Sequence, residues 1–294
     1  MYVYINDGIV PASDAKISVF DHGFLYGDGV YETMRAYDGV VFMIEEHIKR
    51  LFRSASMIRL DIARDAGSVR TAIYRTLSAN SLKSAYMRLT VSRGYGPVGL
   101  DPELCKKPTF IIIAEEFREY PETYYENGIR VIIAETRRNL TTAINPQIKS
   151  LNFLNNILAK VEAKEKGAYE AFMLNASGHL TEGTISNLFF VKDDILCTPS
   201  VECGILDGIT RAIVIDLAAR NGITVREGRF TQDELYRASE VFITNTTAEV
   251  MSACRVDNVD FMIGDVSGLL LKEYRKEVDA YVKEKRGESP SLRE

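Results

Sequence analysis

The chain of 294 residues has no tryptophan, only three histidines and only four cysteines. The cysteines lack Cys-x-x-Cys spacing and the histidines lie far apart in the sequence, so we expect no metal site. The formal net charge is −5, which leaves no basic footprint for nucleic acid. The longest aliphatic runs, such as Phe110–Ala114, are far shorter than the ~18 residues of a membrane span. These absences exclude nucleic acid and membrane as expected partners.

The remaining composition is that of a globular protein of two domains. Hydrophobic residues make up 46% of the chain and charged residues 26%, which is ordinary for a folded protein. The N-terminal segment Met1–Gly8 has neither the basic head nor the apolar segment of a secretory signal, which predicts a cytoplasmic protein. The polar stretch 119–129, with a proline and an Asn-Gly pair, predicts a linker. It would join a small N-terminal domain, 1–118, to a larger C-terminal domain, 130–294.

Hydrophobic periodicity predicts a mixed α/β (α+β) protein. A hairpin is expected around Asn6-Asp7-Gly8, because Asp-Gly between apolar runs favours a tight turn. Amphipathic patterns predict helices over 45–58, 68–77, 150–166, 210–220, 231–238 and 266–285. Apolar or alternating runs predict strands over 85–92, 108–115, 130–134, 171–175 and 187–192. The interleaving of strands with helices favours mixed sheets in two unequal domains.

Two segments carry groups that suit catalysis. Lys149 stands between an apolar segment and a predicted helix, where partial desolvation lowers the pKa of an amine and makes it a usable nucleophile. Glu182 lies in a turn rich in glycine, threonine and serine that leads into the strand 187–192. Each also fits a simpler interpretation: a solvated lysine at a helix start, and a surface turn carboxylate.

Two further segments suit the binding of an anion. Asp207-Gly208 precedes a predicted helix, and the first N–H groups of a helix bind phosphate readily. The strand around 241–244 ends in Asn245-Thr246-Thr247, which offers hydroxyl and amide groups. An ordinary capped helix and an ordinary loop remain the alternatives. The glycines of 20–37 lack the spacings of known phosphate loops and indicate tight turns.

In this order the motifs resemble those of the class IV (fold-type IV) pyridoxal-phosphate-dependent aminotransferases. That family includes branched-chain amino-acid aminotransferases, D-amino-acid aminotransferases and aminodeoxychorismate lyase. The matching segments are 21–32, 47–51, 149–152, 181–187, 208–211 and 246–249. The resemblance runs from about Tyr2 to the last helix. It implies a two-domain fold, with a small N-terminal α/β domain and a larger domain with a barrel-like mixed sheet. It also implies a homodimer, or a larger assembly of dimers, whose subunits share active sites.

The resemblance implies pyridoxal 5'-phosphate as cofactor and assigns residues to it. Lys149 matches the lysine that forms a Schiff base with the cofactor, and Glu182 matches the carboxylate that keeps the pyridine nitrogen protonated. Leu206 matches the leucine that packs on the ring face. The phosphate-binding set is matched by Arg50, Ile209, Thr210 and Thr246. Phe153 stands where many branched-chain enzymes have a tyrosine bound to the phenolic oxygen of the ring.

The substrate residues implied by the resemblance are those of branched-chain enzymes. Tyr86 matches a tyrosine that helps to hold the α-carboxylate, and Arg88 matches an arginine that pairs with the side-chain carboxylate of glutamate. Tyr31 matches a pocket aromatic, and Tyr26 of the partner subunit would reach into the site. The set is completed by Arg35 and Thr247. The resemblance therefore predicts ping-pong transfer of the amino group of L-leucine, L-isoleucine or L-valine to 2-oxoglutarate.

Several alternatives stay open at this point. Tyr86 and Arg88 could be an ordinary strand pair with a salt-bridged arginine. Thr33 stands where typical branched-chain enzymes have glycine, and the Glu-Thr-x-Arg form also occurs in members like aminodeoxychorismate lyase. A lyase, a D-amino-acid transaminase and an (R)-amine transaminase are therefore alternatives. A non-catalytic relative is disfavoured, because Lys149 and Glu182 are both present.

Overall fold

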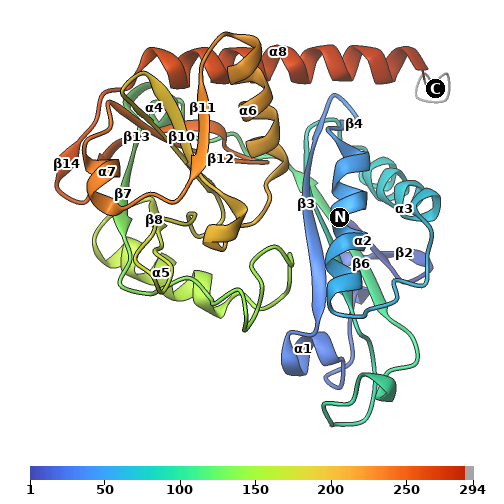
Figure 1. Ribbon diagram of the computed structural model, residues 1–294. Coiled ribbons are helices and arrows are strands. Elements are labelled where there is room, and N and C mark those ends of the chain that lie inside the picture. The colour runs from blue at the N-terminus through green and yellow to red at the C-terminus, as the bar shows by residue number, and fades with distance from the viewer. Residues whose placement is uncertain (289–294) are drawn as a thin grey trace. The chain divides into compact units, whose positions relative to one another are not determined.

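Residues 1–288 are described by a computed structural model, in which the chain forms two units (Figure 1). The first unit contains residues 1–118, 148–152 and 278–288. The second contains 119–147 and 153–277. Within the described residues, no helix is long and apolar enough to cross a membrane.

The first unit is built on an antiparallel sheet with the strand order β2-β1-β6-β5-β3-β4. Its strands are β1 (Tyr2–Ile5), β2 (Gly8–Pro11), β3 (Gly29–Tyr37), β4 (Val40–Val41), β5 (Ala85–Ser92) and β6 (Thr109–Glu116). Its short helices are η1 (Ala12–Asp14), α1 (His22–Tyr26) and η2 (Pro102–Leu104). The predicted hairpin is confirmed, because Ile5 pairs with Gly8 across the two-residue turn Asn6-Asp7.

Two amphipathic helices, α2 (Ile44–Met57) and α3 (Ala66–Ala79), cover one face of this sheet. Successive strand residues point to opposite faces, so Met34 of β3 and Met87 of β5 enter the core with Leu51 of α2. Each such buried side chain contributes about 1.5–3 kcal/mol to the stability of the unit. The same alternation places Tyr31 and Arg88 on the other face of the sheet.

The second unit contains a mixed sheet with the order β11-β10-β9-β12-β13-β7-β8, and β14 pairs with β13. Its strands are β7 (Ile129–Ile133), β8 (Glu170–Phe172), β9 (Asn187–Lys192), β10 (Ile195–Pro199), β11 (Val225–Gly228), β12 (Glu240–Asn245), β13 (Glu249–Val256) and β14 (Val259–Asp260). Its helices are α4 (Glu122–Asn127), α5 (Leu154–Glu165), η3 (Val201–Cys203), α6 (Ile209–Arg220) and α7 (Gln232–Tyr236). The last helix, α8 (Asp265–Glu288), belongs to this unit up to Glu277. Phe189 of β9 and Phe242 of β12 are buried, and their rings stack with centres 5.1 Å apart.

The mixed α/β architecture confirms the predicted fold class, and β5 and β9 have the predicted bounds. The helix predicted over 150–166 was wrong at its start, because α5 begins at Leu154 and Ser150 forms an isolated bridge with Val30 of β3. The predicted division of the chain also differs from the two units. Residues 149–151 pair with β3, and Tyr281 packs edge-on against Phe42 at 5.2 Å, so the segments 148–152 and 278–288 join the first unit. The stretch predicted as a linker contains helix α4 and lies in the second unit.

Candidate active site

Lys149 is held against the sheet of the first unit by its backbone. Tyr31 N donates to Lys149 O at 2.9 Å, and Lys149 N donates to Ser54 Oγ of α2 at 3.2 Å. Two residues further on, Leu151 N donates to Gly29 O at 3.0 Å. A Cβ atom at position 29 would lie 2.6 Å from a carbonyl oxygen of β5, so only glycine fits beside this segment. The lysine is therefore fixed by pairing with β3 and not by the helix that follows it.

Two cationic side chains lie over the aromatic ring of Tyr31. The amine nitrogen of Lys149 lies 4.5 Å from the centre of the Tyr31 ring, and the guanidinium carbon of Arg88 lies 4.1 Å from it. Such contacts are favourable because the face of an aromatic ring is negative. Burial raises the pKa of the Tyr31 hydroxyl well above its usual range, although Arg88 opposes the shift. The structure thus brings Lys149, Tyr31 and Arg88 together around a neutral phenol.

Arg50 takes part in a buried cluster that includes a residue missed by the sequence analysis, Glu32. Arg50 Nε and Nη2 donate to the two oxygens of Glu32 at 2.7 and 2.8 Å, and His47 Nδ1 lies 2.7 Å from Glu32 Oε2. Burial raises the pKa of Glu32, but Arg50 and His47 outweigh it, so the net pKa lies well below its usual range. Burial also lowers the pKa of His47, which is therefore neutral at pH 7. Glu32 therefore orients the Arg50 guanidinium. The signal in the sequence that could have indicated Glu32 was an acidic residue inside an apolar strand.

The other predicted substrate residues of the first unit lie on the strands or at α1. Thr33 pairs with Arg88 across β3 and β5, and Arg35 pairs with Tyr86. The Arg35 guanidinium carbon lies 3.8 Å from the ring centre of Phe117 and 4.3 Å from that of Tyr37, so it packs within an aromatic cage of its own unit. The hydroxyl of Tyr26, the last residue of α1, accepts a hydrogen bond from the backbone N–H of residue 99 at 3.1 Å.

In the second unit, Glu182 is buried and paired with an arginine that sequence reasoning missed. Arg138 Nη2 lies 2.7 Å and Nε 3.0 Å from Glu182 Oε1, and both side chains are less than 10% exposed. Leu206 N donates to Glu182 Oε2 at 2.9 Å, which joins two residues that the sequence assigned to the cofactor ring. The charge of the buried carboxylate is thus balanced, and its second oxygen is held by a backbone amide. Arg138 follows β7 in a loop whose sequence carries no signal for this pairing.

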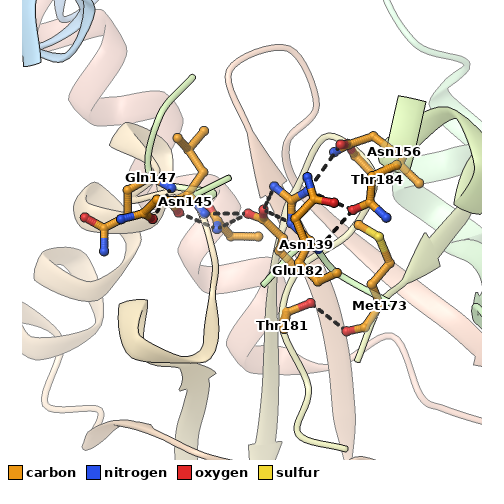
Figure 2. Close-up of polar contacts among 12 residues, drawn as sticks. Asn139, Asn145, Gln147, Asn156, Met173, Thr181, Glu182 and Thr184 are labelled. Carbon is orange, nitrogen blue, oxygen red and sulfur yellow. Dashed lines mark hydrogen bonds and ion pairs between the residues drawn. The ribbon is translucent and has the colours of Figure 1, made fainter. Parts of the chain in front are cut away.

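The hydroxyl residues that flank Glu182 in the motif are held by a backbone carbonyl on one side and by a second buried acid on the other. Thr181 Oγ1 donates to Met173 O at 2.7 Å, beside Glu182 in Figure 2. On the other side, Thr184 Oγ1 and Ser186 Oγ donate to the two oxygens of Glu170 at 2.6 and 2.9 Å. The hydroxyl residues of the motif therefore satisfy a buried carboxylate and hold the Glu182 turn in one conformation.

The N-terminus of α6 carries Ile209 and Thr210, which were predicted to bind the phosphate. Gly208 is its N-cap residue, and no side chain caps the helix there. A Cβ atom at position 208 would lie 2.0 Å from Asn187 Oδ1, which explains the glycine, and Asn187 Nδ2 donates to Leu206 O at 2.9 Å. Ile209 and Thr210 begin the helix, so their backbone N–H groups point along the positive end of its dipole.

The turn between β12 and β13 carries Thr246 and Thr247. Asn245 Oδ1 accepts hydrogen bonds from Thr247 N at 2.9 Å, Thr247 Oγ1 at 3.0 Å and Ala248 N at 2.7 Å. The hydroxyl of Tyr120 lies 3.1 Å from Thr247 Oγ1. One amide side chain thus fixes the shape of the predicted anion-binding turn.

The predicted site residues divide between the two units. The first unit carries Lys149, Arg50, Tyr31, Tyr86, Arg88, Arg35 and Tyr26. The second carries Glu182, Leu206, Ile209, Thr210, Thr246 and Thr247, and Phe153 as the N-cap residue of α5. The chemistry of these donors fits pyridoxal 5'-phosphate: an amine for its aldehyde, a buried carboxylate for its ring nitrogen, and helix amides with hydroxyls for its phosphate.

Comparison with known proteins agrees with this chemistry. Residues 29–256 match the family profile of the class IV amino-transferases, and the chain belongs to that family. Enzymes of this family depend on pyridoxal phosphate, so the predicted enzyme class is confirmed.

The relatives include three activities. A Methanocaldococcus jannaschii protein, provisionally assigned as a branched-chain-amino-acid aminotransferase, is 45% identical over 94% of this chain and 96% of its own length. The D-alanine aminotransferase of Bacillus licheniformis is 36% identical over 87% of this chain and 89% of its own length. The aminodeoxychorismate lyase of Bacillus subtilis is 32% identical over 97% of both chains. Relatives within this one family therefore differ in the reactions for which they are named.

Solved structures of branched-chain aminotransferases share the fold. The enzyme of Thermoproteus uzoniensis, solved with norvaline, has a TM-score of 0.89 and 34% identity, and the match covers 94% of both chains. A second branched-chain aminotransferase, from T.th., was solved with pyridoxamine 5'-phosphate; it has a TM-score of 0.90 and 32% identity over 94% of this chain and 93% of that one.

Proposed function

We propose that this protein transfers the amino group of L-leucine, L-isoleucine or L-valine to 2-oxoglutarate by a ping-pong mechanism, with pyridoxal 5'-phosphate bound to Lys149. The observation that carries the proposal is the cluster of Lys149, Tyr31 and Arg88. An aromatic wall suits an aliphatic side chain, and a cation in the same wall suits the side-chain carboxylate of glutamate. The similarity to branched-chain aminotransferases supports the same substrates.

The cofactor, when bound, supplies an electron sink for the negative charge that develops at the substrate Cα. In this proposal the Lys149 amine removes the proton from Cα and delivers it back on the cofactor side. Glu182, with its charge balanced by Arg138, keeps the ring nitrogen protonated, and Leu206 packs on the ring face. The phosphate is bound by Arg50, Thr246 and the helix start at Ile209 and Thr210.

The substrate is bound by the remaining predicted residues. Tyr86 and Thr247 hold the α-carboxylate, and Arg88 holds the second carboxylate of glutamate. Tyr31 forms the aromatic wall. Arg35 of the same chain completes the pocket, together with Tyr26 of the partner subunit. Because one pocket would serve first the amino acid and then 2-oxoglutarate in a ping-pong reaction, double-reciprocal plots should be parallel.

Replacing Arg88 with methionine should separate the two half-reactions. Methionine keeps the apolar volume but cannot offset a buried carboxylate, so the glutamate half-reaction should slow at least about tenfold more than the leucine half-reaction. Single-turnover kinetics of each half-reaction, followed by the absorbance of the cofactor, measure the difference. Arg88→Lys is the matched control, because it retains the charge. Equal losses for glutamate and leucine would show that Arg88 does not select the second carboxylate.

A second candidate is a D-amino-acid or (R)-amine transaminase, or aminodeoxychorismate lyase. Thr33, which pairs with Arg88 across the sheet, adds a β-branched side chain to the wall where typical branched-chain enzymes have glycine. Relatives with D-alanine aminotransferase and lyase activities support this candidate. A panel of L- and D-amino acids and (R)-1-phenylethylamine with 2-oxoglutarate decides between the transaminases. Formation of 4-aminobenzoate and pyruvate from aminodeoxychorismate would favour the lyase.

We further propose a homodimer, or an assembly of dimers, that buries an apolar surface of the first unit. Phe24 is 67% exposed, Val98 69% and Leu100 84%, which is unusual for large apolar side chains of a monomer. Phe24→Asp should therefore place a charge in the interface and yield a monomer with reduced activity. Light scattering and assays of the same samples measure both effects. A wild-type monomer with full specific activity would contradict the proposal.

A further inference from the structure

The backbone is strained at the residue that ends the Thr246-Thr247 turn. Glu249 has φ +58°, in the left-handed region that favours glycine. Among the non-glycine residues with positive φ in 1–288, it is the only buried one, with 3% exposure. Asn245 pairs with Glu249 across the loop 246–248, so the left-handed residue is the first residue of β13. Glutamate at this position costs conformational energy, so its side chain must contribute something that glycine cannot.

The Glu249 side chain connects the turn to helix α8. Arg275 Nε donates to Glu249 Oε2 at 2.8 Å. The guanidinium carbon of Arg275 lies 5.1 Å from the ring centre of Tyr125 in α4, whose hydroxyl donates to Ala248 O at 3.4 Å. The ion pair and the tyrosine therefore hold two consecutive residues of the turn against two helices of the same unit.

We propose that Glu249 and Arg275 are positioning residues for the cofactor phosphate. Their ion pair fixes residue 249 at the end of the turn, and the side chain of Asn245 fixes residue 248 within it. Thr246 is therefore held in one orientation. A misplacement of about 1 Å in such a contact can cost on the order of 100-fold in function, which gives a reason to retain a strained residue. The inference rests on the proposed binding of pyridoxal phosphate and names the residues that set its phosphate contact.

The test is Glu249→Gly, which relieves the backbone strain and removes the ion pair together. Because glycine favours the left-handed conformation, the variant should fold, with an unfolding temperature of the cofactor-free protein close to that of the wild type. Its affinity for pyridoxal phosphate should fall at least about tenfold, because the phosphate contact loses its fixed geometry. Its affinity for pyridoxal, which lacks the phosphate, should change by less than about twofold. Absorbance titrations of full-length protein freed of cofactor measure both affinities.

Three further variants, all in helix α8, complete the test. Arg275→Met should weaken the affinity for pyridoxal phosphate relative to pyridoxal in the same way, and Arg275→Lys should restore part of it. Glu277→Gln is the matched control, because Glu277 also forms an ion pair from α8, at 2.9 Å to Arg220, without contacting the turn. It should leave both affinities unchanged.

The outcomes distinguish this inference from the proposed function. If Glu249→Gly keeps the wild-type ratio of the two affinities, the positioning role is overturned while the proposed function stands. If the wild-type protein binds no pyridoxal phosphate, the proposed function is overturned, and this inference with it. A selective loss for the phosphorylated form in Glu249→Gly and Arg275→Met, but not in Glu277→Gln, supports the inference.

Discussion

Replacing Lys149 with alanine is expected to slow both half-reactions at least about 1,000-fold, because the only proposed base for the Cα proton is removed. The backbone of the segment should keep its place, since its hydrogen bonds to Tyr31 and Ser54 use main-chain atoms of residue 149. The variant should therefore fold and retain the rest of the site. Borohydride reduction followed by peptide mass spectrometry should find the cofactor linked to Lys149 in the wild type and to no peptide of the variant.

Two controls make the Lys149 experiment decisive. Lys164→Ala removes an exposed amine of α5 and should leave the rate unchanged. Added methylamine should restore part of the rate of Lys149→Ala, because a small amine can replace the missing base. Reduced cofactor attached to a different lysine would refute the assignment.

Replacing Glu182 with glutamine is expected to lower the rate of each half-reaction at least about 100-fold, because the ring nitrogen loses the carboxylate that keeps it protonated. The same change leaves the Arg138 guanidinium buried without its counter-charge, which should destabilise the protein by about 3–5 kcal/mol. Single-turnover rates and denaturant unfolding measure the two effects separately.

The double variant Glu182→Gln with Arg138→Met separates the effect of Glu182 on the reaction rate from its effect on the stability of the fold. Removing the buried guanidinium should restore much of the unfolding free energy lost in Glu182→Gln, because neither charge is then left unpaired. The rate should stay low, because the carboxylate is still missing. Recovery of the rate together with the stability would mean that Glu182 acts only through the folding of the second unit.

Charge balance is a common feature of both halves of the candidate site. Glu32 in the first unit is held by Arg50, and Glu182 in the second is held by Arg138. A buried carboxylate without a cation would take up a proton or unfold its surroundings. Arg50 therefore helps to hold the pKa of Glu32 well below its usual range, and each arginine holds its carboxylate in a fixed position.

The amino-acid sequence by itself determined the features that depend on neighbouring residues. Three such features each arise within a short stretch of the chain, so the local sequence was enough to locate them. They are the turn of Asn6-Asp7, the alternation of 85–92 and the amphipathic pattern of α2. The motifs around Lys149 and Glu182 also lie within short segments, and their order along the chain was enough to indicate the family.

Only the tertiary structure decided which charges meet and which backbone holds the lysine. Arg138 and Glu182 are 44 residues apart, and Arg275 and Glu249 are 26 apart. Each pair forms because folding brings its partners to one place, where Arg138 and Glu182 are both buried and Glu249 is buried beside an exposed Arg275. The segment of Lys149 was predicted to lead straight into a helix, but residues 149–151 pair with β3 and the helix begins only at Leu154. Local propensity carries no information on such long-range pairings, because their free energy comes from burial and hydrogen bonds that exist only in the folded chain.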